Sequence, residues 1–253
     1  MKKLLTLIIL ISSFAQAQFY ELEYEAQVKT KLNEKGLKWF EDNVENPVER
    51  RETIEANENP PKEYYLFKFN DSEANISYIK KVNNSQGAIQ RFIITPENLG
   101  TNYLYYDYKN NARLEERDLY GRKFILKSEL KNVEFVETSE TKEILGYKVQ
   151  QAIAQLENLK IVVWYTKDIK YNYSPDVYLG VKGFVLKEEL IKNDEDKEVL
   201  TTIEAINIKP SKKIQITIPK KGEYVTESEF RRINVEANRK RDEMREQSSS
   251  IKD

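Results

Sequence analysis

The residue types that most often carry out chemistry at neutral pH are missing from this sequence. Its 253 residues include no cysteine and no histidine. Without cysteine there is no thiol nucleophile, no thiolate metal ligand, no disulfide and no lipid-modified N-terminal cysteine. Without histidine, the usual general base, the commonest zinc ligand and every imidazole-containing triad are excluded. We therefore predict a protein that is not an enzyme, with no catalytic, cofactor-binding or metal-binding residue and no cofactor.

A pair of carboxylates is the one major hydrolytic device that needs neither of these residue types. Glycosidases use two Asp or Glu side chains, one of which is buried so that its pKa is raised. The sequence has 42 acidic residues, but most of them fall in turn-like segments or on the polar positions of alternating strands. A two-carboxylate glycan hydrolase therefore stays an alternative, whose mark would be two buried acids about 5–9.5 Å apart in a cleft.

Other polar clusters are better explained as solvated surface. The acidic run at residues 193–196 lacks the glycine and the terminal glutamate of a calcium-binding loop, so a hydrated hairpin turn is predicted. Ser128 and Ser211 each neighbour a lysine, but adjacent side chains on a strand point to opposite faces. The net charge of −1 gives no basic excess for binding nucleic acid, and no glycine-rich phosphate loop is present.

The residues around these clusters have the pattern of a β-rich fold. Apolar and polar residues alternate over residues 19–29, which predicts a long opening strand. Short β-like runs separated by turn-forming residues follow at 64–69, 75–82, 88–94, 103–108, 113–119 and 123–126. Two hairpins are predicted over residues 149–166 and 184–208, and a further strand over 214–218.

Two segments break this pattern and indicate helix. Residues 35–59 scatter apolar side chains among charged ones and end at Pro60-Pro61, which predicts a partly helical excursion. A capping box at residues 226–229 predicts the start of a C-terminal helix that runs to Gln247. The expected fold is mainly β, a curved antiparallel sheet or incomplete barrel, in a single domain over residues 18–247 with a disordered tail at 248–253.

The first residues have the organisation of an export signal. Lys2 and Lys3 precede an apolar run, and Ala15-Gln16-Ala17 provides the small residues of a cleavage site. We predict a signal peptide at residues 1–17 and a mature chain that begins at Gln18 and has no transmembrane span. The expected location is the periplasm, the outer-membrane surface or the medium, and the protein is not expected to be a lipoprotein.

Tyrosine is the most conspicuous aromatic residue, with 16 copies. One interpretation is core and cross-strand packing, which aromatic side chains favour in sheets. The other is a concave aromatic surface that binds an apolar or carbohydrate-like ligand, or a protein partner. Both concern the same residues in or beside predicted strands: Tyr64, Tyr65, Tyr103, Tyr105, Tyr106, Tyr108, Tyr171 and Tyr173.

Residues 142–186 contain a series of motifs with a recognisable order. They are Gly146-Tyr147, Trp164-Tyr165 followed by Asp168, and Gly180 to Leu186 with Gly183 and Phe184. In this order and spacing the segment resembles the GLPGLI family of exported bacterial proteins. The signature departs from the family at four positions, where Leu, Pro, Leu and Ile are replaced by Val181, Lys182, Phe184 and Val185. Because the family has no established activity, the resemblance implies export, and we expect structural roles for Gly146, Tyr147, Trp164, Tyr165, Asp168, Gly180, Gly183 and Phe184.

Together these features predict a non-enzymatic protein of the cell envelope. We expect its curved sheet to bind an apolar ligand or a protein partner, because an open sheet has an apolar face that must be covered. The alternatives are a structural accessory of an outer-membrane assembly and the two-carboxylate glycan hydrolase.

Overall fold

The computed structural model describes residues 19–79, 103–211 and 213–250, and within them it contains a twelve-stranded sheet, a sheet of two strands (β7 and β11) and three helices. The predicted signal peptide at residues 1–17 and the predicted strand at 88–94 lie outside the described residues. The helices are α1 (Glu34–Asn43), α2 (Pro47–Glu58) and α3 (Glu227–Ser250). The strands are β1 (Phe19–Leu32), β2 (Glu63–Phe69), β3 (Glu73–Tyr78), β4 (Tyr103–Asp107), β5 (Ala112–Leu119), β6 (Arg122–Glu129), β7 (Lys131–Asn132), β8 (Val136–Ile144), β9 (Tyr147–Leu156), β10 (Leu159–Thr166), β11 (Tyr178–Leu179), β12 (Phe184–Asn193), β13 (Lys197–Ser211) and β14 (Glu223–Val225).

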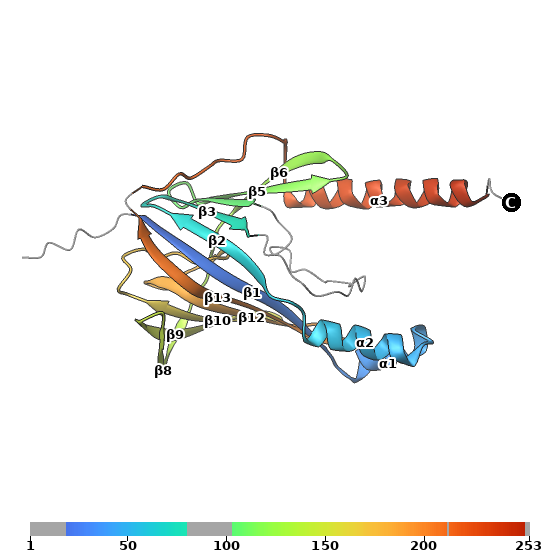
Figure 1. Ribbon diagram of the computed structural model, residues 1–253, viewed down its shortest axis with the longest axis horizontal. Coiled ribbons are helices and arrows are strands. Elements are labelled where there is room, and N and C mark those ends of the chain that lie inside the picture. Colours follow the sequence, from blue (N-terminus) through green and yellow to red (C-terminus); the bar gives the residue numbers. More distant parts are fainter. Residues whose placement is uncertain (1–18, 80–102, 212, 251–253) are drawn as a thin grey trace, which may run out of the picture.

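Twelve strands form an open sheet in the order β14-β6-β5-β4-β3-β2-β1-β13-β12-β10-β9-β8. Neighbouring strands are antiparallel, except for the parallel pair β14 and β6. The long strands β1 and β13 pair along their full length at the centre, and the sheet bends to either side of them (Figure 1). A bulge between Glu23 and Tyr24 contributes to this bend, because an extra residue increases local twist. The predicted fold class, a mainly β protein with a curved and unclosed antiparallel sheet, is confirmed.

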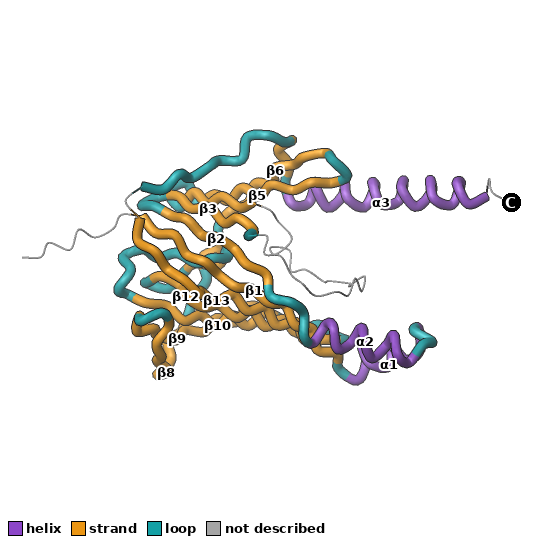
Figure 2. Tube along the Cα trace, viewed as in Figure 1, coloured by secondary structure: helices purple, strands orange, loops and turns teal. Residues whose placement is uncertain are grey.

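The helices lie at two ends of the sheet. In Figure 2, α1 and α2 lie side by side beyond the end of β1, and α3 begins beside β5 and β6 and extends away from them. The helical excursion predicted at residues 35–59 is therefore a hairpin of two helices. The capping box that starts α3 is present, because the Thr226 hydroxyl accepts a hydrogen bond from the Glu229 amide while the Glu229 carboxylate accepts one from the Thr226 amide.

The largest core covers one face of the sheet and is filled by aromatic side chains. Strands β1 and β2 contribute Tyr24, Phe67 and Phe69, each at most 1% exposed. The connection between β10 and β12, residues 167–183, crosses this face, and Tyr173 stacks on Tyr108 with ring centroids 3.6 Å apart. The packing interpretation of the tyrosine stripe is confirmed for the residues that are buried in this core, which are Tyr65, Tyr106, Tyr171 and Tyr173. Tyr105 is also buried but lies outside this core.

Two predicted boundaries differ from the structure. Residues 214–218 do not form a strand, although their side chains alternate. The backbone of Thr217 is bound instead by a side chain, because its amide donates to Asn75 Oδ1 and its carbonyl accepts from Asn75 Nδ2. Helix α3 continues to Ser250, past the predicted end at Gln247 and into the predicted disordered tail. The remaining tail residues, 251–253, lie outside the described residues.

Gly180 allows the connection of residues 167–183 to pack against the chain beside it. Its φ is +148°, and a Cβ atom at this position would lie 2.0 Å from the carbonyl oxygen of Val133. We expect Gly180→Ala to lower the free energy of unfolding by roughly 2–4 kcal/mol, because it adds both overpacking and an unfavourable φ. Urea denaturation measures this change.

Gly146 provides the matched control for this prediction. Its φ is +81°, but a Cβ atom there would meet nothing within 4 Å. Gly146→Ala should therefore cost only about 1–2 kcal/mol, the price of a left-handed conformation. Equal losses in the two variants would show that the close approach to Val133 does not constrain Gly180.

Candidate functional site

The candidate site is a groove at the end of the sheet where α1 and α2 meet the turn between β12 and β13. Its volume is about 640 Å³, within the range of ligand sites in proteins. We call it the Trp39 groove. Its lining comes from the end of β1 (Thr30, Leu32), α1 and the residue after it (Lys35, Trp39, Phe40, Val44), α2 (Glu49, Thr53, Asn57) and the turn with the start of β13 (Glu195, Asp196, Lys197).

Helical spacing places the groove residues on two facing stripes. Lys35 and Trp39 are four residues apart on α1, so they lie on one face of that helix. Glu49, Thr53 and Asn57 are also spaced by four and form a polar stripe along α2. The groove therefore combines an aromatic side chain on one wall with hydroxyl, amide and carboxylate groups on the other.

The start of α1 is fixed against the turn that closes the groove. The Asn33 side chain caps α1 by accepting hydrogen bonds from the amides of Lys35 and Gly36, at 3.0 and 3.2 Å. Its Nδ2 donates to the carbonyl oxygen of Glu195 at 3.0 Å. A Cβ atom on Gly36 would lie 2.3 Å from the carbonyl oxygen of Asp196, so only glycine permits this approach. These contacts make the end wall of the groove a rigid part of the fold.

An ion pair joins α1 to the turn between β12 and β13 at this end of the groove. Lys35 Nζ lies 2.5 Å from Glu195 Oε2, and both side chains are largely exposed. The hydrogen bond and charge of Lys35 lower the pKa of Glu195, and the same pair raises the pKa of Lys35. Glu195 is therefore ionised at neutral pH and suited to accepting hydrogen bonds rather than to donating a proton as a general acid.

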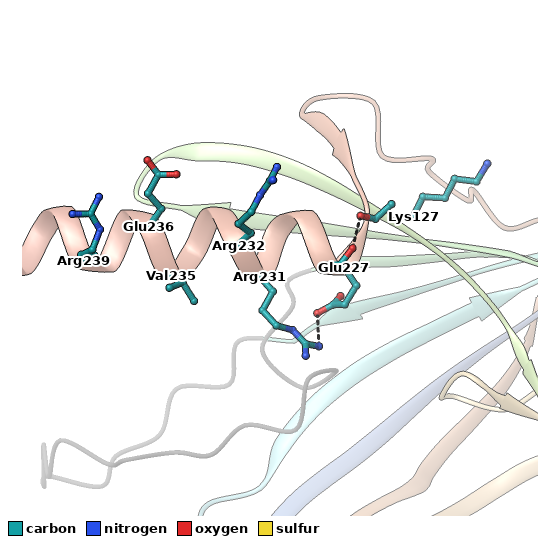
Figure 3. A pocket seen from close by; sticks show the side chains of 9 residues that line it. Lys127, Glu227, Arg231, Arg232, Val235, Glu236 and Arg239 are labelled. Carbon is teal, nitrogen blue, oxygen red and sulfur yellow. Dashed lines mark hydrogen bonds and ion pairs between the residues drawn. The ribbon is translucent and has the colours of Figure 1, made fainter.

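A larger depression of about 890 Å³ runs along α3. Most of its lining residues come from this one helix, among them Arg231, Arg232 and Arg239. Figure 3 shows Arg231 and Arg232 pointing to different sides of α3, so their charges do not converge on one point. We interpret this depression as the side of a projecting helix, with no geometry that would fix a ligand.

A cluster of buried polar side chains lies inside the core, behind the connection of residues 167–183. Glu188 on β12 is 0% exposed and Asp176 in the connection is 3% exposed. The Ser174 hydroxyl donates to Glu188 Oε2 at 3.1 Å, and the Tyr106 hydroxyl donates to the carbonyl oxygen of Pro175 at 3.0 Å. On β5, Arg113 Nη2 lies 2.6 Å from Glu115 Oε2, and Glu115 also pairs with Arg117.

This cluster contains two buried acids, Glu188 and Asp176, but no access for a substrate. Burial, together with the charge of Asp176, raises the pKa of Glu188 well above its ordinary value. Such a shift suits a general acid. Both carboxylates are nevertheless enclosed by the core, so in this structure they do not meet a substrate, and we assign them to the interior that holds the connection in place.

The raised pKa of Glu188 predicts a distinct dependence of stability on pH. Because the folded protein holds this proton more tightly than the unfolded chain, the contribution of Glu188 is most favourable below its unfolded pKa of about 4.3 and is lost as the pH rises toward its folded pKa. Glu188→Gln removes this loss while keeping an acceptor for Ser174. We expect the variant to gain stability relative to the parent protein as the pH rises from 5 to 8, by about 1–3 kcal/mol at the upper end.

Thermal melts of both proteins across this pH range measure the difference. Glu189→Gln is the control, because Glu189 lies on the same strand but on the exposed side, where it pairs with Lys187 at 3.1 Å. A constant difference between Glu188→Gln and the parent protein at every pH would contradict the predicted burial effect.

The residues singled out by the family resemblance lie in several places rather than in one site. Tyr165 is buried and its hydroxyl donates to Glu137, while its neighbour Trp164 is half-buried beneath Lys142, whose Nζ lies 4.1 Å from the ring centroid. Gly183 lies against the Thr166 carbonyl, where a Cβ atom would be 2.5 Å away. The others occupy turns, strand starts and the surface: Gly146 in the turn after β8, Tyr147 at the start of β9, exposed Asp168, exposed Gly180 and buried Phe184.

The Trp39 groove is not predicted from the sequence, where Trp39 is one of several apolar residues in a charged segment. The available signal was the four-residue spacing of Lys35 and Trp39, and of Glu49, Thr53 and Asn57. No local pattern indicates that these two helices face one another across the turn at residues 193–196.

Comparison with known proteins finds a matching family and similar solved structures. A family model described as "N-glycanase peptide, N-terminal domain" matches residues 98–227. Two solved structures of PNGF-II are similar in fold, one in space group P21 and one in C2, each with a TM-score of 0.51 and 19% sequence identity. Each alignment covers 87% of this chain, but only 34% of the PNGF-II chain in the first structure and 33% in the second. A search of curated proteins finds no match.

Proposed function

Since this chain belongs to the family described as N-glycanase peptide, N-terminal domain, we propose that it takes part in the enzymatic processing of N-glycosylated proteins by engaging the glycosylated substrate. The observation that carries this proposal is the family match over residues 98–227, a range that includes every strand from β4 to β14. The fold shared with PNGF-II over 87% of the chain supports it. Because the chain spans about a third of the PNGF-II structures, the activity of a whole N-glycanase is itself part of the proposal.

These matches correct two predictions made from the sequence. The prediction of a non-enzymatic envelope protein that binds an apolar ligand or a protein partner is wrong, and so is the prediction that the protein is not an enzyme, because the matches are to N-glycanase proteins. The physical basis of the first prediction also fails. The core face of the bent sheet is filled by its own aromatic side chains, such as Phe69 and Tyr173, rather than left open for a ligand.

The geometry of the described residues supports binding of a glycosylated substrate, and it gives less support to hydrolysis of a bond in that substrate. The acid pair with a raised pKa is enclosed in the core. The Trp39 groove is accessible, but Glu195 at its rim is held in the ionised form by Lys35. A groove of this kind can hold hydroxyl-rich groups through hydrogen bonds and an aromatic surface.

A comparison of two forms of one glycoprotein tests the proposal. The purified full-length chain is titrated with an N-glycosylated protein and with the same protein after its glycans have been removed, and binding is measured by calorimetry. We expect at least tenfold tighter binding to the glycosylated form. Equal affinity for the two forms, or binding to neither, would overturn the proposed function.

Export from the cytoplasm is part of the same proposal. It is supported by the basic residues, apolar run and small residues at positions 2–17, and by the resemblance of residues 142–186 to the GLPGLI family. In the part of the chain that the structure describes, no helix has the length and apolar character needed to cross a membrane.

A further inference from the structure

We infer that the Trp39 groove is the binding site for the saccharide of the N-glycan. This inference rests on the proposed function and adds to it a location and a ligand class. It places the recognition of sugar between the helical hairpin α1–α2, which lies outside the residues 98–227 that match the family model, and residues 195–197, which lie inside them. Four features of the groove support this assignment: its aromatic surface, its hydrogen-bonding groups, its charge and its rigidity.

Trp39 supplies an aromatic surface that the fold itself does not use. Its side chain is 58% exposed, although burial of a tryptophan is a large source of stability in most proteins. Phe40 packs edge-on against it, with ring centroids 5.4 Å apart and an interplanar angle of 73°. This contact limits the orientations of the indole and leaves one flat apolar surface for a ligand. The C–H face of a pyranose ring is flat and apolar in the same way.

The rest of the groove supplies both donors and acceptors for sugar hydroxyls. Thr53 and Asn57 on α2 can each donate and accept hydrogen bonds, and Glu49 on the same stripe accepts them. Lys35 donates from the opposite wall. A sugar hydroxyl needs both kinds of partner, because it donates one hydrogen bond and accepts others. An aromatic platform facing mixed polar groups therefore suits a polyol better than a purely apolar ligand.

The charge of the lining disfavours anionic ligands. Three acidic residues, Glu49, Glu195 and Asp196, face two lysines, Lys35 and Lys197. Lys35 pairs with Glu195 and Lys197 with Asp196, so Glu49 leaves the lining with one net negative charge. A phosphate or an acidic peptide would be repelled by this surface, whereas a neutral oligosaccharide would not.

The walls of the groove are held in position before any ligand arrives. The Asn33 cap and the close approach of Gly36 fix α1 to the turn between β12 and β13. Arg50 on α2 donates to the carbonyl oxygen of Val44 at 2.9 Å and so fixes the connection between the two helices. Because weak ligands such as sugars gain affinity when little ordering is required, this rigidity favours binding.

Calorimetric titration with a free N-glycan tests the assignment. The probe is an oligomannose N-glycan that retains its two core N-acetylglucosamine residues, added to the full chain and to three variants. Trp39→Ala should weaken binding at least tenfold, and Trp39→Phe should restore part of the loss because it keeps a flat aromatic ring. Tyr224→Ala is the matched control, since Tyr224 is 57% exposed on β14, away from the Trp39 groove, and its loss should leave affinity unchanged.

The outcomes separate this inference from the proposed function. If the parent protein binds the free glycan and Trp39→Ala binds it equally well, the groove is not the site, but the proposed function stands. If the parent protein does not bind the free glycan, the inference is overturned, and the comparison of glycosylated and deglycosylated protein decides whether the proposed function fails too. Circular dichroism of Trp39→Ala checks the fold, and the partial recovery in Trp39→Phe distinguishes loss of a binding surface from misfolding.

Discussion

Glu115→Gln is expected to lower the free energy of unfolding by about 3–5 kcal/mol. Glu115 is 2% exposed and pairs with Arg113, which is itself 7% exposed, and with Arg117. The substitution removes the negative charge that lies beside the largely buried Arg113 guanidinium. A buried charge that loses an ion-pair partner is costly because the protein interior solvates it far less well than water does. Urea denaturation at neutral pH measures the loss.

Glu116→Gln is the control for this effect. Glu116 is the next residue on β5, but it points to the other face, where it lies 3.3 Å from Lys123 in a partly exposed ion pair. An exposed pair is screened by water, so this substitution should cost less than about 1 kcal/mol. Similar losses in the two variants would show that burial does not determine the importance of Glu115.

Phe69→Ala is expected to lower the free energy of unfolding by about 3–5 kcal/mol. The Phe69 side chain is fully buried and stacks on Phe184, with ring centroids 4.7 Å apart. It also meets Tyr171 at 5.2 Å and Tyr173 at 5.7 Å, so it joins β2 to the connection that crosses the core face. The substitution leaves a cavity between these two parts of the fold.

Phe69→Leu provides the comparison, because it fills most of the same volume. We expect it to cost less than half as much as Phe69→Ala in chemical denaturation. Proteolysis of Phe69→Ala should also begin within residues 167–183, since this connection loses its main aromatic contact. A loss below about 1 kcal/mol for Phe69→Ala would contradict the view that the aromatic core holds the connection against the sheet.

Strands were predicted well wherever one face is buried and the other is wet. The alternation at residues 19–29 corresponds to buried Leu22, Tyr24 and Ala26 in β1. Residues 214–218 show the limit of the same signal, because their backbone is held by the Asn75 side chain instead of a neighbouring strand. The alternation of apolar and polar residues indicates which side chains face the core, but it does not indicate whether a neighbouring strand is available for backbone hydrogen bonds.

The buried polar residues could not be predicted from local pattern. Glu188 lies in the charged run Lys187-Glu188-Glu189, which has the appearance of a solvated strand end. It is buried because β12 passes under the connection that carries Ser174 and Asp176. Ser174 and Glu188 are 14 residues apart in the sequence, and only the path of the chain between them brings them into contact.

The candidate site was hidden for a related reason. Each helix of the α1–α2 hairpin is short, and its exposed face resembles an ordinary solvated surface. The groove exists only because Asn33 and Gly36 bring α1 against a turn about 160 residues later in the chain, a separation at which single-sequence patterns carry no information. The resemblance of residues 142–186 to the GLPGLI family stays a prediction.

The indole NMR signals of the protein test the central claim most directly. The sequence has two tryptophans, Trp39 and Trp164, so a ¹⁵N-labelled sample gives two indole N–H resonances, which Trp164→Phe assigns. On titration with the oligomannose N-glycan, we predict a saturable shift of the Trp39 resonance and an unchanged Trp164 resonance. A Trp39 resonance that does not move at saturating glycan, or a shift confined to Trp164, would contradict the recognition of N-glycans by the α1–α2 hairpin.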